Sequence, residues 1–129
     1  MQHDSSRAEA EAPGRPLVEL LYFDGCPNHE AARALVERVG RELGVELELR
    51  LVNVPDEDAA RRLRFLGSPT IRVAGRDVDP QAAERDDYVL SCRVYRTASG
   101  FAGQPDERWL REAIQQEASK ATHAASNGT

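Results

Sequence analysis

The spacing of apolar residues changes along the chain, and each spacing predicts a different element. Residues 17–23 form an apolar run of strand length, as a buried strand would. Over residues 27–43 the apolar side chains recur at helical spacing, and Gly44 then provides a stop. Residues 46–54 alternate between leucine and charged side chains, which is typical of a strand near a sheet edge. The helical stripe consists of Ala32, Leu35, Val36, Val39 and Leu43.

The middle of the chain predicts a short helix and two further strands. Acidic residues at 56–58 open the helix, where the helix dipole favours negative charge, and Gly67 ends it. A third strand is predicted at residues 70–74 and a fourth at residues 91–97. Residues 78–90 between them form a polar insertion. The acidic side chains in and beside this insertion lack the spacing of a calcium loop, so a solvated loop is predicted; they are Asp77, Asp79, Glu84, Asp86 and Asp87.

A last helix completes the predicted fold. It opens at residues 104–107, which place a proline and two acids in the first turn. The element order is then β-α-β-α-β-β-α, an α/β fold with a four-stranded mixed sheet and flanking helices. Residues 1–16 and 118–129 carry no apolar stripe and are predicted to be disordered tails, which leaves one domain at 17–117. The core face of the last helix is predicted to be Trp109, Leu110, Ala113 and Ile114.

Composition excludes several classes of protein. The 129 residues suit a single core, and 17 basic against 22 acidic side chains give a net charge of −5. A negative balance argues against nucleic acid as a partner. Apolar runs fall short of the roughly 18 residues of a membrane span, and the polar start of the chain carries no signal core, so a cytoplasmic protein is expected. Its two cysteines are then better explained as catalytic or metal-binding thiols than as a structural disulfide.

Cys26 lies where the first strand turns into the first helix. Asp24 and Gly25 break the apolar run before it. If Cys26 is the N-cap, Pro27 takes the first helical position and the sulfur faces free backbone N–H groups, which favour a thiolate. His29, one turn further on, can add a positive charge or a proton relay. The alternatives are a small buried hydrophobic cysteine and a solvated histidine.

Three segments carry a resemblance to a known family. They are D-G-C-P-N at 24–28, G-S-P-T at 67–70 and S-C-R-V-Y-R-T at 91–97. Together they resemble the thioredoxin superfamily, and more closely the thioredoxin-like DF family (seleno)proteins of bacteria, over roughly residues 17–116. Some members of that family carry selenocysteine where this chain has Cys26. The resemblance implies a thioredoxin-like fold and a redox site at Cys26.

The resemblance also implies the surroundings of that site. Pro69 matches a proline that such proteins hold in the cis form, which would turn the Ser68 backbone outward and offer its N–H and C=O groups to a thiol or peptide substrate. The expected substrate-binding residues are Asp24, Pro27, Asn28, Ser68 and Pro69. The chain departs from a thioredoxin in reading C-P-N-H in place of C-x-x-C, so no disulfide forms within the motif.

Cys92 is the second candidate thiol. Strand alternation places it on one face with Val94 and Arg96, either as a packed strand cysteine or as a resolving thiol or metal ligand for Cys26. The predicted strand order puts the two cysteines toward opposite ends of the sheet. A disulfide requires Cα atoms about 4.4–6.8 Å apart, so Cys26 is expected to act as a one-cysteine site.

These residues predict a thiol oxidoreductase without a cofactor or metal. The Cys26 thiolate, helped by His29, would attack a disulfide, a peroxide or another soft electrophile. The oxidised Cys26 would then be resolved by an external thiol, by the disulfide system of a partner protein, or by Cys92 if it comes within reach. Two alternatives remain open. One is a soft-metal or organomercurial thiol binder with Cys26 and either Cys92 or His29 as ligands, in which Asp24 would be the acid toward an organomercurial. The other is a non-catalytic thioredoxin-like binding module.

Overall fold

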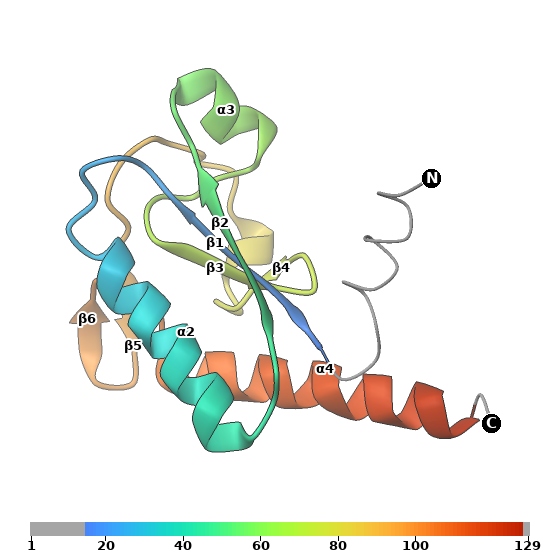
Figure 1. The fold of residues 1–129 in the computed structure, drawn as a ribbon. Coiled ribbons are helices and arrows are strands. Elements are labelled where there is room, and N and C mark those ends of the chain that lie inside the picture. Colours follow the sequence, from blue (N-terminus) through green and yellow to red (C-terminus); the bar gives the residue numbers. More distant parts are fainter. Residues whose placement is uncertain (1–14, 128–129) are drawn as a thin grey trace.

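The computed structural model describes residues 15–127, with side chains through Lys120 (Figure 1). The predicted N-terminal tail at 1–16 lies outside these residues except for Arg15 and Pro16. The described chain forms a mixed α/β structure in which one sheet is flanked by helices. The predicted α/β class is therefore confirmed.

Four strands form the main sheet, in the order β2-β1-β3-β4. The central strand β1 (Leu17–Tyr22) pairs in parallel with β2 (Glu48–Asn53) and antiparallel with β3 (Thr70–Val73). The two-residue strand β4 (Arg76–Asp77) pairs antiparallel with β3 and forms the far edge. The prediction of a four-stranded mixed sheet, with the 46–54 strand at an edge, is confirmed.

Helices cover the two faces of this sheet. On one face, α2 (His29–Leu43) and α4 (Glu107–Asn127) pack together (Figure 1). The predicted stripe of α2 faces the core, with Ala32, Val36 and Val39 fully buried. On the other face, the short helix α3 (Glu57–Arg62) packs with Leu21 in a second cluster. The main cluster contains Val18, Leu20, Ala32, Val36, Val39, Ile71, Val73, Val78, Leu110 and Ile114.

Local signals set the ends of the helices. Asp56 caps α3 by accepting a hydrogen bond from the Ala59 N–H at 2.8 Å. Gly44 ends α2 in the left-handed conformation, with φ of 67°, as predicted. The start of α2 differs from the prediction, because the N-cap is Asn28 and not Cys26. The Cys26 N–H is already used in a turn with Phe23, so the chain makes one more turn before the helix begins.

The fourth strand differs from its predicted position. Residues 91–97 were expected to complete the sheet, but the edge of β3 is taken by β4. A tight turn at Ala74 and Gly75, both with positive φ, folds β4 straight back onto β3. The end of the expected strand instead forms β5 (Tyr95–Thr97), which pairs with β6 (Gly100–Ala102) in a separate hairpin. The intervening insertion contains one short 3₁₀ turn, η1 (Ala82–Glu84).

The last helix is longer than the apolar pattern predicts. The sequence at 118–129 carries no apolar stripe and was expected to be a tail, yet α4 continues to Asn127. Alanine has the highest intrinsic helix propensity, and this stretch is rich in alanine. The helix propensity of alanine therefore explains why the helix continues beyond the residues that pack against the core.

Candidate functional site

Cys26 follows the central strand β1 in a tight turn. Its N–H donates to the Phe23 carbonyl at 3.1 Å, and Gly25 in the turn has a φ of 90°, which favours glycine. Cys26 is 5% exposed. A second turn over Pro27 and Asn28 then leads into α2. The site residue thus lies buried at the junction of β1 and α2.

His29 holds this turn through three contacts. Its Nδ1 donates to the Cys26 carbonyl at 3.2 Å, which requires the proton on that nitrogen. Its ring stacks on Tyr22 with centroids 4.5 Å apart, and its Nε2 lies 3.3 Å from a Glu30 carboxylate oxygen. The predicted alternative of a freely solvated histidine is wrong, because the side chain is only 24% exposed. The contact with Cys26 is to the carbonyl, so the ring positions the cysteine backbone.

Asn28 joins the start of α2 to the segment before α4. Its carbonyl accepts hydrogen bonds from the Ala32 N–H and from Gln104 Nε2, each at 3.1 Å. Its side chain makes no capping bond in the described part of the chain and lies against Gly103, where an added Cβ would approach Nδ2 to 2.5 Å. The uncapped amides at the helix start favour negative charge nearby.

Asp24 and Pro27 are exposed on the surface of the same loop. The Asp24 carboxylate accepts a hydrogen bond from Asn53 Nδ2 at 3.2 Å, which ties the loop to the end of β2. Both residues lie within three positions of Cys26, so the structure keeps the predicted loop residues together.

The Ser68–Pro69 peptide bond is cis, as the resemblance implies, and both residues are buried. The expectation that the Ser68 backbone is open to a substrate is wrong. Its N–H donates to the Ser91 carbonyl at 2.8 Å, and its carbonyl accepts from the Arg93 N–H at 2.9 Å. The segment at 91–93 therefore occupies both backbone groups. It leaves the Ser68 side chain fully buried, with its hydroxyl unpartnered within residues 15–127.

Cys92 pairs with Ser68 in an isolated parallel bridge and is exposed. The prediction that Cys92 sits at the far end of the sheet is wrong, because its segment does not join the sheet as a strand. The bridge to Ser68, just before β3, brings Cys92 to the end of the sheet at which β1 leads into Cys26. Both cysteines are free thiols.

Arg93 anchors this segment, and sequence reasoning did not single it out. It is 3% exposed, and its guanidinium donates to Asp77 at 2.7 Å, to Thr70 at 3.0 Å and to Asp79 at 3.3 Å. It also lies over the ring of Tyr95, 4.3 Å from the centroid. The prediction of a solvated loop is therefore wrong for Asp77 and Asp79. The sequence signal that could have found Arg93 is the alternation of the predicted strand, which places Arg93 and Tyr95 on the same face.

Tyr95 completes the anchor. It is fully buried, and its hydroxyl donates to the Pro69 carbonyl. Burial raises the pKa of the Tyr95 phenol above its ordinary value of about 10. Arg93 and Tyr95 thus hold the 91–97 segment against β3 and the cis proline from two sides.

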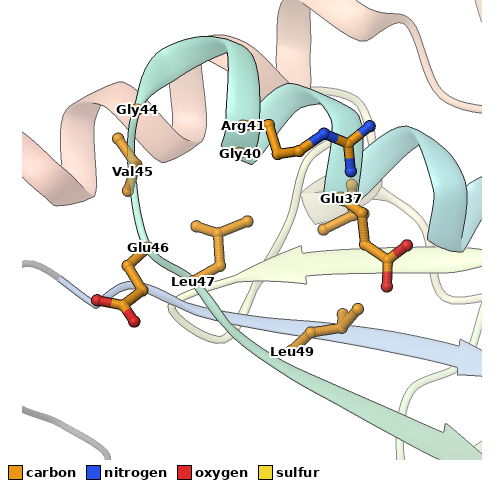
Figure 2. Close-up of a pocket in the computed structure, with 9 residues that line it drawn as sticks. Glu37, Gly40, Arg41, Gly44, Val45, Glu46, Leu47 and Leu49 are labelled. Carbon is orange, nitrogen blue, oxygen red and sulfur yellow. The ribbon is translucent and has the colours of Figure 1, made fainter.

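A separate cavity of about 530 Å³ lies away from the cysteines, between the end of α2 and the segment leading into β2 (Figure 2). Leucine side chains line its floor, and charged side chains stand at its rim. Its lining residues are Val36, Glu37, Gly40, Arg41, Gly44, Val45, Glu46, Leu47 and Leu49.

Among residues 15–127, no group of three or more His, Cys, Asp or Glu side chains is arranged to hold a metal ion. The helices of the same residues include none that is long and apolar enough to cross a membrane.

Comparison with known proteins adds no relative. The chain matches no protein-family model, and no curated protein matches it. Membership of the DF family (seleno)proteins therefore stays a prediction from the three segments at 24–28, 67–70 and 91–97.

Proposed function

We propose that this chain is a thioredoxin-like thiol redox protein that uses Cys26 as its nucleophile in the cytoplasm. The observation that carries the proposal is the position of Cys26, between the central strand β1 and the start of α2. Cys26 precedes the N-cap Asn28 by two residues, and nucleophilic cysteines of proteins are often found at such a junction of strand and helix N-terminus.

The arrangement of the sheet supports the thioredoxin-like part of the proposal. Two parallel strands, β1 and β2, are joined by a helix, and two antiparallel strands follow on the other side of β1. This agrees with the expected β-α-β-α-β-β-α order once Arg76–Asp77 replaces 91–97 as the fourth strand. The segments at 24–28 and 67–70 lie at one end of this sheet.

The proposed chemistry is attack by the Cys26 thiolate on a soft electrophile. With a disulfide, the new S–S bond forms as the old one breaks, and one thiolate leaves. With a hydroperoxide, the sulfur takes the distal oxygen, giving Cys26 sulfenic acid and an alcohol or water after proton transfer. An external thiol or a partner protein then returns Cys26 to the thiol, so no bound cofactor is required.

The burial of Cys26 narrows the class of substrate. At 5% exposure, the thiol admits small electrophiles more readily than a folded protein or a bulky aromatic disulfide. We therefore favour a peroxide or a small organic disulfide as the substrate. Asp24, Pro27 and Asn28 form the surface that such a substrate meets first.

A comparison of single-cysteine variants tests the proposal. The Cys92→Ser variant retains Cys26, and the Cys26→Ser variant retains the exposed Cys92 as a matched control. The expected result is faster oxidation of Cys26 than of Cys92 by hydrogen peroxide, despite the burial of Cys26. Intact-mass spectrometry over time measures both rates. Oxidation of Cys92 at an equal or higher rate would contradict the proposal.

A further inference from the structure

We propose that Cys92 is the resolving cysteine of this site and that oxidation joins Cys26 and Cys92 in a disulfide within one chain. This inference rests on the proposed function and assigns the partner of its intermediate. It replaces the one-cysteine site that the predicted strand order implied.

The first step in the argument is the position of Cys92. Hydrogen bonds from the Ser68 N–H to Ser91 and from the Arg93 N–H to Ser68 place Cys92 directly opposite Ser68. Backbones paired in this way lie about 4.8 Å apart. Cys92 is exposed, so its thiol is not committed to the core.

The second step is the position of Cys26. In the β1–β3 register, Leu21 lies opposite Thr70, so Phe23, just after β1, and Ser68, just before β3, lie at the same end of the sheet. The Cys26 N–H returns to the Phe23 carbonyl, and the ends of such a turn lie within about 7 Å of each other. Both cysteines therefore lie at the end of the sheet where β1 ends and β3 begins: Cys26 one turn beyond Phe23, and Cys92 opposite Ser68.

The third step is what holds Cys92 there. Immediately after it, the Arg93 side chain is buried against Asp77, Asp79 and Thr70. Before it, the segment is held by the Ser68 N–H, which donates to the Ser91 carbonyl at 2.8 Å, and by the Val89 N–H, which donates to the Phe65 carbonyl at 3.0 Å. Disulfide geometry needs Cα atoms about 4.4–6.8 Å apart. We infer that a local shift of Ser91 and Cys92, which are both exposed and precede the buried Arg93, brings the Cα atoms to this separation.

A buried hydroxyl lies beside the bridge that carries Cys92. Ser68 is 0% exposed, and its Oγ has no hydrogen-bond partner within residues 15–127. An unpartnered buried hydroxyl costs about 1–3 kcal/mol unless something accepts its proton. Neither cysteine sulfur is its hydrogen-bond partner in the reduced protein, so an unsatisfied donor lies beside the Cys92 bridge.

The proposed reaction has three steps. Cys26 thiolate and a hydroperoxide give Cys26 sulfenic acid and an alcohol or water. The Cys92 thiol then attacks the sulfenic sulfur, forms the S–S bond and releases water. A dithiol reductant restores both thiols and leaves as its own disulfide.

Non-reducing peptide mapping of the full chain tests the inference. The wild-type monomer is treated with hydrogen peroxide, free thiols are blocked, and the digest is analysed by mass spectrometry. We expect a linked pair of peptides containing Cys26 and Cys92, which dithiothreitol separates. In the Cys92→Ser variant, we expect Cys26 sulfenic acid in its place, trapped by dimedone.

A displaced thiol provides the matched control. The double variant Cys92→Ser, Val94→Cys moves the thiol to an exposed position on the other side of Arg93, away from the bridge to Ser68. We expect this variant to lose the linked peptides. Two outcomes would overturn the role of Cys92 and leave the proposed function standing. One is equal linkage in the control variant; the other is Cys26 sulfenic acid in the wild type without any linked peptides. If Cys26 in Cys92→Ser fails to oxidise, both proposals fall.

Discussion

Two buried polar residues, Arg93 and Tyr95, hold the segment that carries Cys92. Arg93 is surrounded by carboxylates and a hydroxyl, and Tyr95 donates to the Pro69 carbonyl. Removing one partner of such a group leaves the other buried and unsatisfied, which is costly. These contacts form because the β3–β4 turn brings Asp77 beside Arg93. The local sequence pattern does not predict this long-range contact.

Tyr95 should make the protein sensitive to alkaline pH. Its pKa is raised in the folded state, so the unfolded phenol loses its proton first, near pH 10. The contribution is fully present below that pH and is lost as pH rises toward the folded pKa. Above about pH 10, wild-type stability should fall more steeply than that of Tyr95→Phe, by about 1.4 kcal/mol per pH unit.

Denaturant unfolding across pH 8 to 12 would measure this difference. At neutral pH the Tyr95→Phe variant should already be less stable, by about 1–3 kcal/mol, because the buried Pro69 carbonyl loses its donor. Tyr88→Phe is the control, since the Tyr88 hydroxyl meets the exposed Arg64. Identical alkaline slopes for wild type and Tyr95→Phe would show that Tyr95 ionises as freely in the fold as in the unfolded chain.

At the scale of elements, the packing of the 91–93 segment onto the start of β3 depends on a glycine. A Cβ on Gly67 would meet Arg93 Cβ at 2.9 Å and the Ser91 carbonyl oxygen at 3.1 Å. The sequence predicted Gly67 as the end of a helix. Its close approach to residues far along the chain was not predictable from local pattern.

Gly67→Ala should therefore disturb the candidate site more than an equally strained glycine does. Gly75 also has a positive φ, but an added Cβ there meets nothing within 4 Å. Gly75→Ala should cost about 1–2 kcal/mol through backbone strain alone. Gly67→Ala should cost about 1–3 kcal/mol more, through overpacking, and should reduce Cys26–Cys92 linkage. Equal costs, with linkage unchanged, would show that the 91–93 segment is not held by this contact.

The same contrast explains which elements the sequence could predict. Strand β1, the end of helix α2 at Gly44 and the acidic start of helix α3 follow from short-range periodicity and turn chemistry, and they form as predicted. The fourth strand was misplaced because residues 91–97 alternate as a strand does, whereas β4 has only two residues and shows no such pattern. Only the tight pairing of β4 with β3 decides between them.

At the scale of the whole molecule, α2 and α4 meet through charged as well as apolar side chains. The Glu107 carboxylate, at the start of α4, accepts from Arg38 on α2 at 2.8 Å and from Arg111 at 2.7 Å. These hydrogen bonds lower the pKa of Glu107 to about 2. Arg111 also reaches Glu42 on α2. The helices that frame the cysteine site are thereby linked on their outer surface.

Acid should weaken this link. Because the pKa of Glu107 is lowered in the fold, its stabilisation is present above the ordinary value of about 4.5 and is lost as pH falls toward 2. The side chain is 37% exposed, so solvent screening keeps the contribution small, within about 1 kcal/mol. Wild type should be more stable than Glu107→Gln at pH 7, and the difference should vanish near pH 2.

The control is Glu37→Gln, which removes an ion pair within α2 alone. High salt should shrink the Glu107 difference at pH 7, since exposed charges are screened. A difference that is independent of pH and salt would mean that Glu107 acts by packing and not by charge.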